Sequence, residues 1–254
     1  MGKRIETFVV GVQKAGTTSL FALMREHPQL AAPGRKELHF FDDERRNWMV
    51  PDYADLASSF GDDGDRMRFE ITPSYSYWPR AMERIHRYNP GARIILLFRN
   101  PFERAWSHWC MQYARGREDL PFARAIREEA ARLDGLSADS AQRRYFSYVD
   151  RGRYATQLER LLTLFPHEQI LLLTAEALGE DQSAVLATIA RFLDIHPFPP
   201  LAPARENARV PFRYPALPDE DDRAFVAGLL RAEMQGLRDL TRSQIIYDLD
   251  RDRS

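Results

Sequence analysis

Cysteine and lysine are both scarce in this chain. Cys110 is the single cysteine among 254 residues, which excludes an internal disulfide framework and a metal site built from several thiolates. A reducing compartment suits such a sequence best. Lys3, Lys14 and Lys36 are the three lysines, and all other basic residues are arginines. Lysine supplies a compact point charge and arginine a planar fork, so a site that needs one ammonium group cannot exchange them.

The sequence also lacks a strong net charge and long apolar runs. Its 36 basic and 37 acidic residues leave a formal net charge of −1, so no overall basic field is available for nucleic acid or an anionic membrane. No apolar run approaches the roughly 20 residues of a membrane-spanning helix. The N-terminal residues do not follow the pattern of a signal peptide. We therefore expect a cytoplasmic protein without a nucleic-acid partner, in which any anion binding is local.

Strand patterns alternate with helix patterns along the chain, as in a parallel sheet with helices on both faces. We expect strands at residues 8–12, 68–72, 93–98 and 169–174, and helices at 20–27, 81–88, 102–115, 121–133, 150–164, 183–193 and 219–238. No linker or repeat interrupts this order, so the sequence predicts one α/β domain over residues 1–254. Ligands of such sheets bind beyond the carboxyl ends of the strands.

The segment from Gly11 to Thr18 resembles a phosphate-binding loop. It follows a predicted strand, opens a predicted helix and keeps Gly11 and Gly16 five residues apart, as backbone cradles for phosphate do. The nucleoside triphosphatase pattern has Lys and then Ser or Thr after the second glycine, whereas here Thr17 and Thr18 occupy those places and Lys14 lies inside the loop. The alternative interpretation is a glycine turn that Thr17 or Thr18 caps.

A second cluster of donors follows the predicted strand at 93–98. A nucleotide bound with Mg²⁺ would need an acidic residue at the end of a neighbouring strand, but this strand is followed by Arg99, Asn100, Arg104 and Ser107. These groups suit a second phosphate held directly. Arg99 and Ser107 converge only if the helix runs back past the strand end. The alternatives are a surface ion pair for the arginine and a solvent-facing serine.

Together these motifs are similar to those of the sulfotransferases that use 3′-phosphoadenosine-5′-phosphosulfate. Gln13-Lys-Ala-Gly-Thr-Thr-Ser-Leu20 resembles the family's 5′-phosphosulfate loop, and Arg99-Asn-Pro-Phe-Glu-Arg-Ala-Trp-Ser107 resembles its 3′-phosphate motif. Lys36-Glu-Leu-His-Phe-Phe-Asp42, Glu70-Ile-Thr-Pro-Ser-Tyr75 and Arg151-Gly-Arg-Tyr-Ala155 resemble segments of the branch that includes heparan sulfate sulfotransferases and many bacterial enzymes. The resemblance implies the P-loop-like fold of that family.

The resemblance also implies how the donor is held. Lys14 would stabilise the leaving phosphate oxygen, and Arg99 and Ser107 would bind the 3′-phosphate. The 5′-phosphate would be held at a helix N-terminus, where the dipole favours an anion. Its ligands would be the backbone amides of Ala15, Gly16, Thr17, Thr18 and Ser19 and the hydroxyls of Thr17 and Thr18. Arg209, in a segment similar to the loop that closes over the nucleotide, is a further 3′-phosphate ligand or a solvated arginine. The product would be adenosine 3′,5′-bisphosphate, and no metal is required.

Glu37 is the expected general base, by the family's Lys-Glu pattern, and would take the proton of the acceptor hydroxyl. Lys36 would tune this carboxylate or contact the sulfonate. An ordinary carboxylate is a weak base, so a desolvated or carefully hydrogen-bonded site is expected. His39 is the alternative base, because histidine does this work in other branches of the family. The competing interpretations are a solvated Lys-Glu pair and a packing role for His39.

The sequence thus predicts a sulfotransferase that acts on a hydroxyl, or less readily an amine, of a carbohydrate, lipid or natural product. The alternatives are a P-loop kinase of a small molecule and a non-catalytic nucleotide-binding module. Ile71 stands where heparan-type enzymes carry Lys, which argues against a heparan-like polyanionic acceptor. No motif identifies the acceptor. A homodimer stays open because symmetric dimers are common.

Overall fold

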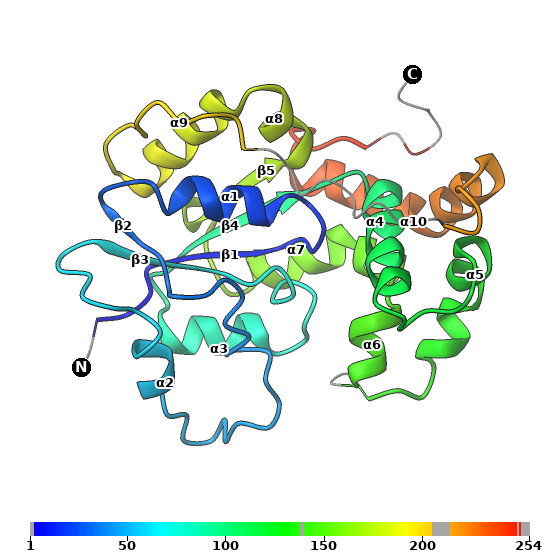
Figure 1. Ribbon diagram of the computed structural model, residues 1–254, viewed down its shortest axis with the longest axis horizontal. Coiled ribbons are helices and arrows are strands. Elements are labelled where there is room, and N and C mark those ends of the chain that lie inside the picture. Colours follow the sequence, from blue (N-terminus) through cyan, green and yellow to red (C-terminus); the bar gives the residue numbers. More distant parts are fainter. Residues whose placement is uncertain (1–2, 138–139, 205–213, 248, 250–254) are drawn as a thin grey trace. The chain divides into compact units, whose positions relative to one another are not determined.

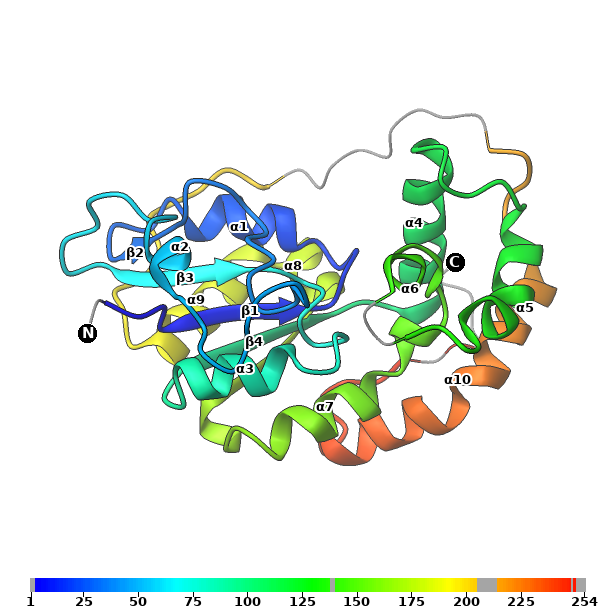
Figure 2. The same ribbon diagram turned by 90° about the horizontal axis from the view of Figure 1, so that it is seen from below.

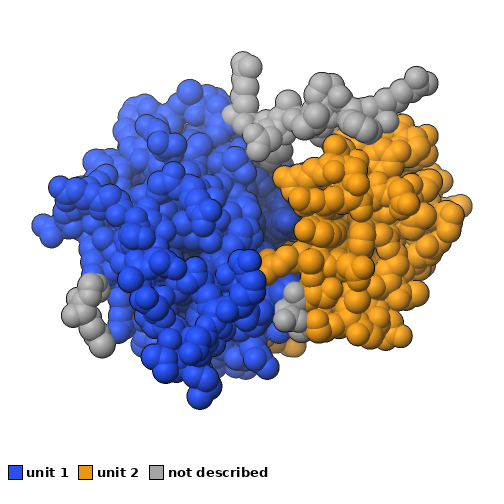
Figure 3. Space-filling model, turned by 60° about the horizontal axis from the view of Figure 1, so that its bottom comes forward, with its two compact units in different colours: residues 1–98, 161–208 blue, residues 99–160, 209–254 orange. Residues whose placement is uncertain are grey.

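The computed structural model describes residues 3–137, 140–204, 214–247 and 249. The chain forms two compact units (Figure 3). Residues 1–98 and 161–208 make up the first unit, and residues 99–160 and 209–254 make up the second. A single domain over residues 1–254 therefore stays a prediction. None of the described helices is both long and apolar enough to cross a membrane.

A five-stranded, all-parallel sheet forms the centre of the first unit. Its strands run in the order β2 (Leu30–Ala31), β3 (Met67–Ile71), β1 (Thr7–Gly11), β4 (Arg93–Phe98) and β5 (Ile170–Thr174). The four predicted strands are confirmed, and β2 is added to them. β5 is an outer strand of the sheet, and only its Leu173 is buried.

Helices cover both faces of this sheet, which confirms the predicted fold class. In both views α1 (Thr17–Met24) lies on one face and α3 (Ala81–Tyr88) on the other (Figures 1 and 2). The remaining helical segments of this unit are α2 (Ala54–Ala57), η2 (His167–Gln169), α8 (Ala175–Glu180) and α9 (Gln182–Leu193). Because β1 and β4 have strands on both sides and helices above and below, nearly all their side chains are buried.

The second unit is helical throughout its described part. It contains α4 (Pro101–Ala114), α5 (Phe122–Leu133), α6 (Ala141–Phe146), η1 (Asp150–Gly152), most of α7 (Tyr154–Leu162) and α10 (Glu220–Leu240). Trp106 stacks on Trp109 at 4.9 Å between ring centroids. The Thr156 hydroxyl donates to Glu233 at 2.7 Å and so joins α7 to α10. The predicted helix at 150–164 is in fact η1 followed by the shorter α7.

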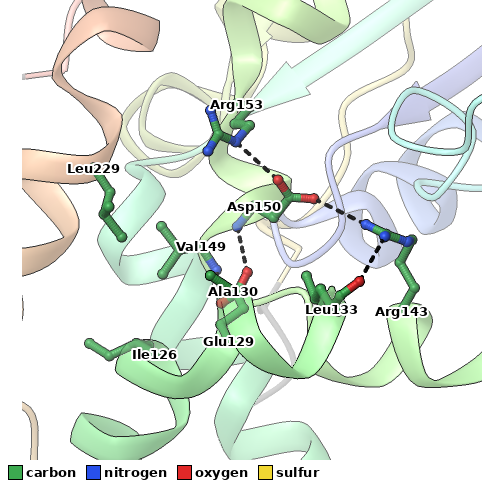
Figure 4. A pocket seen from close by; sticks show the side chains of 9 residues that line it. All are labelled: Ile126, Glu129, Ala130, Leu133, Arg143, Val149, Asp150, Arg153 and Leu229. Carbon is green, nitrogen blue, oxygen red and sulfur yellow. Dashed lines mark hydrogen bonds and ion pairs between the residues drawn. The ribbon is translucent and has the colours of Figure 1, made fainter. Parts of the chain in front are cut away.

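A pocket of about 240 Å³ lies within this helical unit (Figure 4). Its lining residues are Ile126, Glu129, Ala130, Leu133, Arg143, Val149, Asp150, Arg153 and Leu229. Its charged groups bind one another. Asp150 lies 3.0 Å from Arg153 and 3.8 Å from Arg143, and its N–H donates to Glu129 at 2.7 Å. These contacts hold η1 against α5 and α6, which is a structural role.

Candidate active site

The loop after β1 adopts the compact turn that its glycines predict. The N–H of Val12 donates to Leu97 O at 2.7 Å, and the N–H of Ala15 donates to Val12 O at 3.2 Å. Lys14 and Gly16 have φ angles of 73° and 86°, in the left-handed region. Glycine adopts this conformation at little cost and lysine only with strain. The loop therefore holds Lys14 in a conformation that an isolated chain rarely adopts.

Gly11 is required by a close approach of the chain to its neighbours. A Cβ atom at this position would lie 2.3 Å from Ser76 Oγ and 2.8 Å from Leu96 Cδ1. The register of β1 against β4 also shifts between Val9 and Gly11. The first glycine of the motif thus lets the strand end pass tightly between β3 and β4 before the loop begins.

Helix α1 begins earlier than predicted, at Thr17, so Thr17, Thr18 and Ser19 form its first turn. Its N-cap is Gly16, which has no side chain to cap the helix, and no acidic residue lies in the first turn. The alternative of a turn capped by Thr17 or Thr18 is therefore wrong, since both threonines lie inside the helix. N–H groups at such an end, together with the helix dipole, form a suitable anion site.

The side chains of the two candidate bases contact each other and belong to one charged cluster. Lys36 Nζ is 2.5 Å from one oxygen of Glu37, and His39 Nε2 is 3.3 Å from the other. On its other side, His39 Nδ1 is 3.0 Å from Asp42 Oδ2. Asp42 is fully buried and also accepts a hydrogen bond of 2.6 Å from the Ser74 hydroxyl. Two carboxylates thus flank one imidazole, and a lysine flanks the outer carboxylate.

This arrangement separates the pKa values of the two bases. Burial opposes ionisation of Glu37, but hydrogen bonds from His39 and Lys36 and their positive charges outweigh it and lower its pKa to about 2. Burial also opposes charge on His39, but hydrogen bonds and attraction to Asp42 and Glu37 raise its pKa to about 9. At neutral pH the cluster therefore contains an imidazolium between two carboxylates.

The cluster and the loop lie at the same edge of the sheet. β1 and β3 are neighbouring parallel strands that end on one side (Figure 2). Beyond β3, the N–H of Thr72 donates to Val9 O at 3.2 Å and that of Ser76 to Val10 O at 2.9 Å. The segment that includes Ser74 is thereby fixed to the end of β1, from which the loop with Lys14 starts.

The second phosphate motif lies in the other unit, around the start of α4. The Asn100 side chain caps this helix by accepting from the N–H groups of Phe102 and Glu103 at 3.0 and 3.2 Å. Arg99 forms an ion pair of 3.9 Å with Glu103. Ser107 lies one helical turn after Glu103, and both are partly exposed. The ion pair with Glu103 places the Arg99 side chain at the first turn of α4, and Ser107 lies one turn further along the same helix.

Two side chains of the cluster were not singled out by sequence reasoning. Asp42 and Ser74 complete the cluster around His39. Asp42 lies three residues after His39, a spacing that could have suggested the contact, but no local signal links Ser74 to either. Arg209 lies outside the described residues. The predicted phosphate-loop residues and both candidate bases do lie at one edge of the sheet.

A parallel sheet with a phosphate-type loop between β1 and α1 defines a P-loop-like α/β protein. The sequence model of the sulfotransferase domain family matches residues 4–200 of this chain. The chain belongs to the sulfotransferase domain family. It is 32% identical over 193 residues to heparan sulfate glucosamine 3-O-sulfotransferase 6 of Mus musculus, a match that covers 75% of this chain and 52% of that protein. The chain thus spans about half the length of this curated relative.

Other similar proteins share the domain or the fold. The chain is 26% identical over 194 residues to bifunctional heparan sulfate N-deacetylase/N-sulfotransferase 4 of Mus musculus, covering 74% of this chain and 22% of that protein. The crystal structure of a sulfotransferase from Alicyclobacillus acidocaldarius superposes with a TM-score of 0.76 at 23% identity, covering 96% of this chain and 98% of that one. The crystal structure of sulfotransferase STF9 from Mycobacterium avium superposes with a TM-score of 0.53 at 15% identity, covering 99% of this chain and 79% of that one. These structures support the fold.

Proposed function

We propose that this protein transfers a sulfonate group from 3′-phosphoadenosine-5′-phosphosulfate to a hydroxyl, or less readily an amine, of a carbohydrate, lipid or natural product. One observation carries the proposal. The phosphate-type loop follows β1 and the Glu37 N–H binds Ile71 O at the end of the neighbouring strand β3, so the loop and the Glu37 cluster lie at the same edge of the sheet. Transfer between two oxygens needs an anion site and a base beside each other. Membership in the sulfotransferase family supports the same chemistry.

The loop and the start of α1 would hold the 5′-phosphosulfate. The donor supplies an activated sulfonate on a phosphate leaving group. The N–H groups from Ala15 to Ser19 and the hydroxyls of Thr17 and Thr18 would bind the phosphate oxygens, and Lys14 would neutralise the charge that develops on the leaving oxygen. Arg99 and Ser107 would bind the 3′-phosphate. Positive charge for the reaction thus comes from side chains, without a metal.

Glu37 is the base that the electrostatics favour over His39. An imidazolium with a pKa of about 9 has no lone pair to accept a proton at neutral pH. Glu37 is ionised there, and its pKa of about 2 makes it a weak base. Proton transfer to it therefore occurs late, when the acceptor oxygen has begun to bond to sulfur and its proton has become acidic. The sulfur–phosphate oxygen bond breaks, the sulfur–acceptor oxygen bond forms, and the proton passes to Glu37.

The acceptor we propose is not densely anionic. Ile71 is fully buried at the end of β3 and offers no charge beside the base. The net charge of −1 provides no attraction for a polyanion over the chain as a whole. A neutral sugar, lipid or natural-product hydroxyl agrees better with these features than a heparan-like chain does.

The first test of this proposal is thermal unfolding with adenosine 3′,5′-bisphosphate and with ATP, each with and without Mg²⁺. At a hundredfold excess over its Kd a ligand adds about 2.7 kcal/mol, which raises the midpoint of a chain of this size by roughly 5 to 11 °C. A larger, metal-independent shift with the bisphosphate supports the donor assignment. A shift only with ATP and Mg²⁺ favours a kinase and contradicts the proposal.

Two substitutions then separate catalysis from nucleotide binding. Lys14→Ala and Glu37→Gln should each lower sulfonate transfer at least 100-fold. A general base contributes about 10² to 10⁴, and one group that stabilises developing charge contributes about 10² to 10³. Glu37→Gln should keep the shift with the bisphosphate. Lys14→Ala should reduce this shift without abolishing it, because the leaving oxygen belongs to the 5′-phosphate and the N–H groups of α1 still bind that phosphate. Lys3→Ala and Glu26→Gln are the matched controls, since Lys3 binds the carbonyl oxygen of Gly64 and Glu26 pairs with Arg25 on the surface. Bisphosphate binding without transfer to any hydroxyl or amine acceptor would indicate a non-catalytic module.

A further inference from the structure

Five consecutive N–H groups of the segment with the base are held by residues 70–75, which form the end of β3 and the turn just after it. The N–H of Glu37 donates to Ile71 O at 3.2 Å, and that of Leu38 donates to Glu70 Oε1 at 3.1 Å. The N–H of His39 is 3.4 Å from Thr72 Oγ1. The N–H groups of Phe40 and Phe41 then approach the Tyr75 hydroxyl at 3.1 and 3.4 Å. The backbone of residues 37–41 is therefore bound mainly through side chains of residues 70–75.

Such support is needed because the segment with the base is strained. Glu37 and His39 have φ angles of 62° and 52°, in the left-handed region that non-glycine residues avoid. Leu38 between them is buried. Strained residues of this kind persist only when their surroundings determine them. Free of β3, this backbone would relax, and the carboxylate of Glu37 would leave its position beside His39.

Glu70 is the least ordinary member of the supporting segment. It is fully buried, and its Oε1 accepts from both the Leu38 N–H and the Thr72 hydroxyl. Its Oε2 has no hydrogen-bond partner in the described part of the chain. Burial, opposed by these hydrogen bonds and by the positive charge of His39, raises the pKa of Glu70 to about 7. A buried carboxyl group of this kind is costly, so a role beyond packing is expected of it.

We propose that Glu70 and Tyr75 are positioning residues, which hold the strained backbone of residues 37–41 so that Glu37 faces His39 at the reaction site. Both residues are fully buried, and both bind backbone N–H groups of the segment with the base. Glu70 acts directly on Leu38, and through Thr72 on His39. Tyr75 acts on the next two N–H groups. This inference rests on the proposed sulfonate transfer, since it assigns roles in presenting that reaction's base.

The test compares substitutions that keep or remove the acceptor atoms. Glu70→Gln keeps a carbonyl oxygen for Leu38 and Thr72, and should retain kcat within about threefold. Glu70→Leu keeps the volume but no acceptor, and should lower kcat more than 30-fold while KM for the donor changes less than threefold. Tyr75→Phe should lower kcat about tenfold. Phe69→Leu is the control, because Phe69 is buried on the same strand against Phe21 and contacts no part of the 37–41 backbone by hydrogen bond.

Amide hydrogen exchange gives a readout that does not depend on turnover. Exchange at Leu38 and His39 should be at least tenfold faster in Glu70→Leu than in the native protein, and native-like in Glu70→Gln and Phe69→Leu. Unchanged exchange, or equal loss of kcat in the Gln and Leu variants, overturns the positioning role. If the native protein shows neither sulfonate transfer nor a thermal shift with the bisphosphate, the proposed function is overturned instead. The exchange rates then still decide whether Glu70 holds this backbone.

Discussion

Asp42→Asn tests the charge arrangement of the cluster through protein stability. Asp42 is completely buried, lies 3.0 Å from His39 Nδ1 and accepts from Ser74 at 2.6 Å. The variant keeps the size of the side chain and removes the charge that helps to keep His39 protonated. Because a buried hydrogen bond to a charged group contributes about 1.5 to 3 kcal/mol, we expect a loss of that size in the free energy of unfolding at pH 6.5.

The pH dependence of this loss follows from the pKa of His39. A rise from the ordinary 6.5 to about 9 corresponds to at most about 3.4 kcal/mol. Since 46% of the His39 side chain is exposed, solvent screening reduces this to about 1 to 2 kcal/mol. For a raised pKa, the contribution is fully present below pH 6.5 and is lost as pH rises through about 9. The difference between native protein and Asp42→Asn should therefore narrow by about 1 kcal/mol between pH 6.5 and 9.5.

Urea unfolding at half-unit steps of pH measures this difference. Asp43→Asn is the matched control. This substitution removes the same charge one residue away, and Asp43 pairs with the exposed Arg45 instead of His39. Its difference from the native protein should not change over the same range. A difference for Asp42→Asn that is equally independent of pH would refute the assignment of an imidazolium between two carboxylates.

Two further predictions concern the phosphate motifs. Gly11→Ala should lower the free energy of unfolding by about 1 to 3 kcal/mol, the usual cost of overpacking, because its Cβ would meet Ser76 Oγ at 2.3 Å. Chemical denaturation should show that the double variant with Ser76→Gly recovers part of this loss. Additive losses in the double variant would contradict the clash. In titration calorimetry, Arg99→Ala should weaken the binding of adenosine 3′,5′-bisphosphate about 10- to 150-fold, the equivalent of one charge-assisted contact, and leave the binding of adenosine 5′-monophosphate unchanged. Arg45→Ala, at a side chain that is 91% exposed, is the control and should affect the binding of neither ligand. Equal losses of affinity for both ligands would remove Arg99 from the 3′-phosphate site.

The sequence by itself determined the features that depend on neighbours along the chain. Buried strands such as β1 and β4 require continuous apolar residues, and the amphipathic pattern of α3 follows from a period of 3.6 residues. The phosphate-type loop could be recognised from the spacing of Gly11 and Gly16, of which Gly16 is needed by the local backbone because of its positive φ angle. The placement of Glu103 and Ser107 one turn apart on α4 also follows from local helical spacing, once the start of that helix is known.

Only the tertiary structure decided how the base is presented. Ser74 binds Asp42 across 32 positions of sequence, and Glu70 binds Leu38 across another 32. No periodicity connects such segments. They meet because β2, which precedes residues 37–42, pairs with β3, and because the Glu37 N–H binds Ile71 O at the end of β3. The choice between Glu37 and His39 likewise depends on burial and on which charges lie beside them, and these are properties of packing. Local sequence could therefore name the two candidate bases, and the folded chain assigned them different charges.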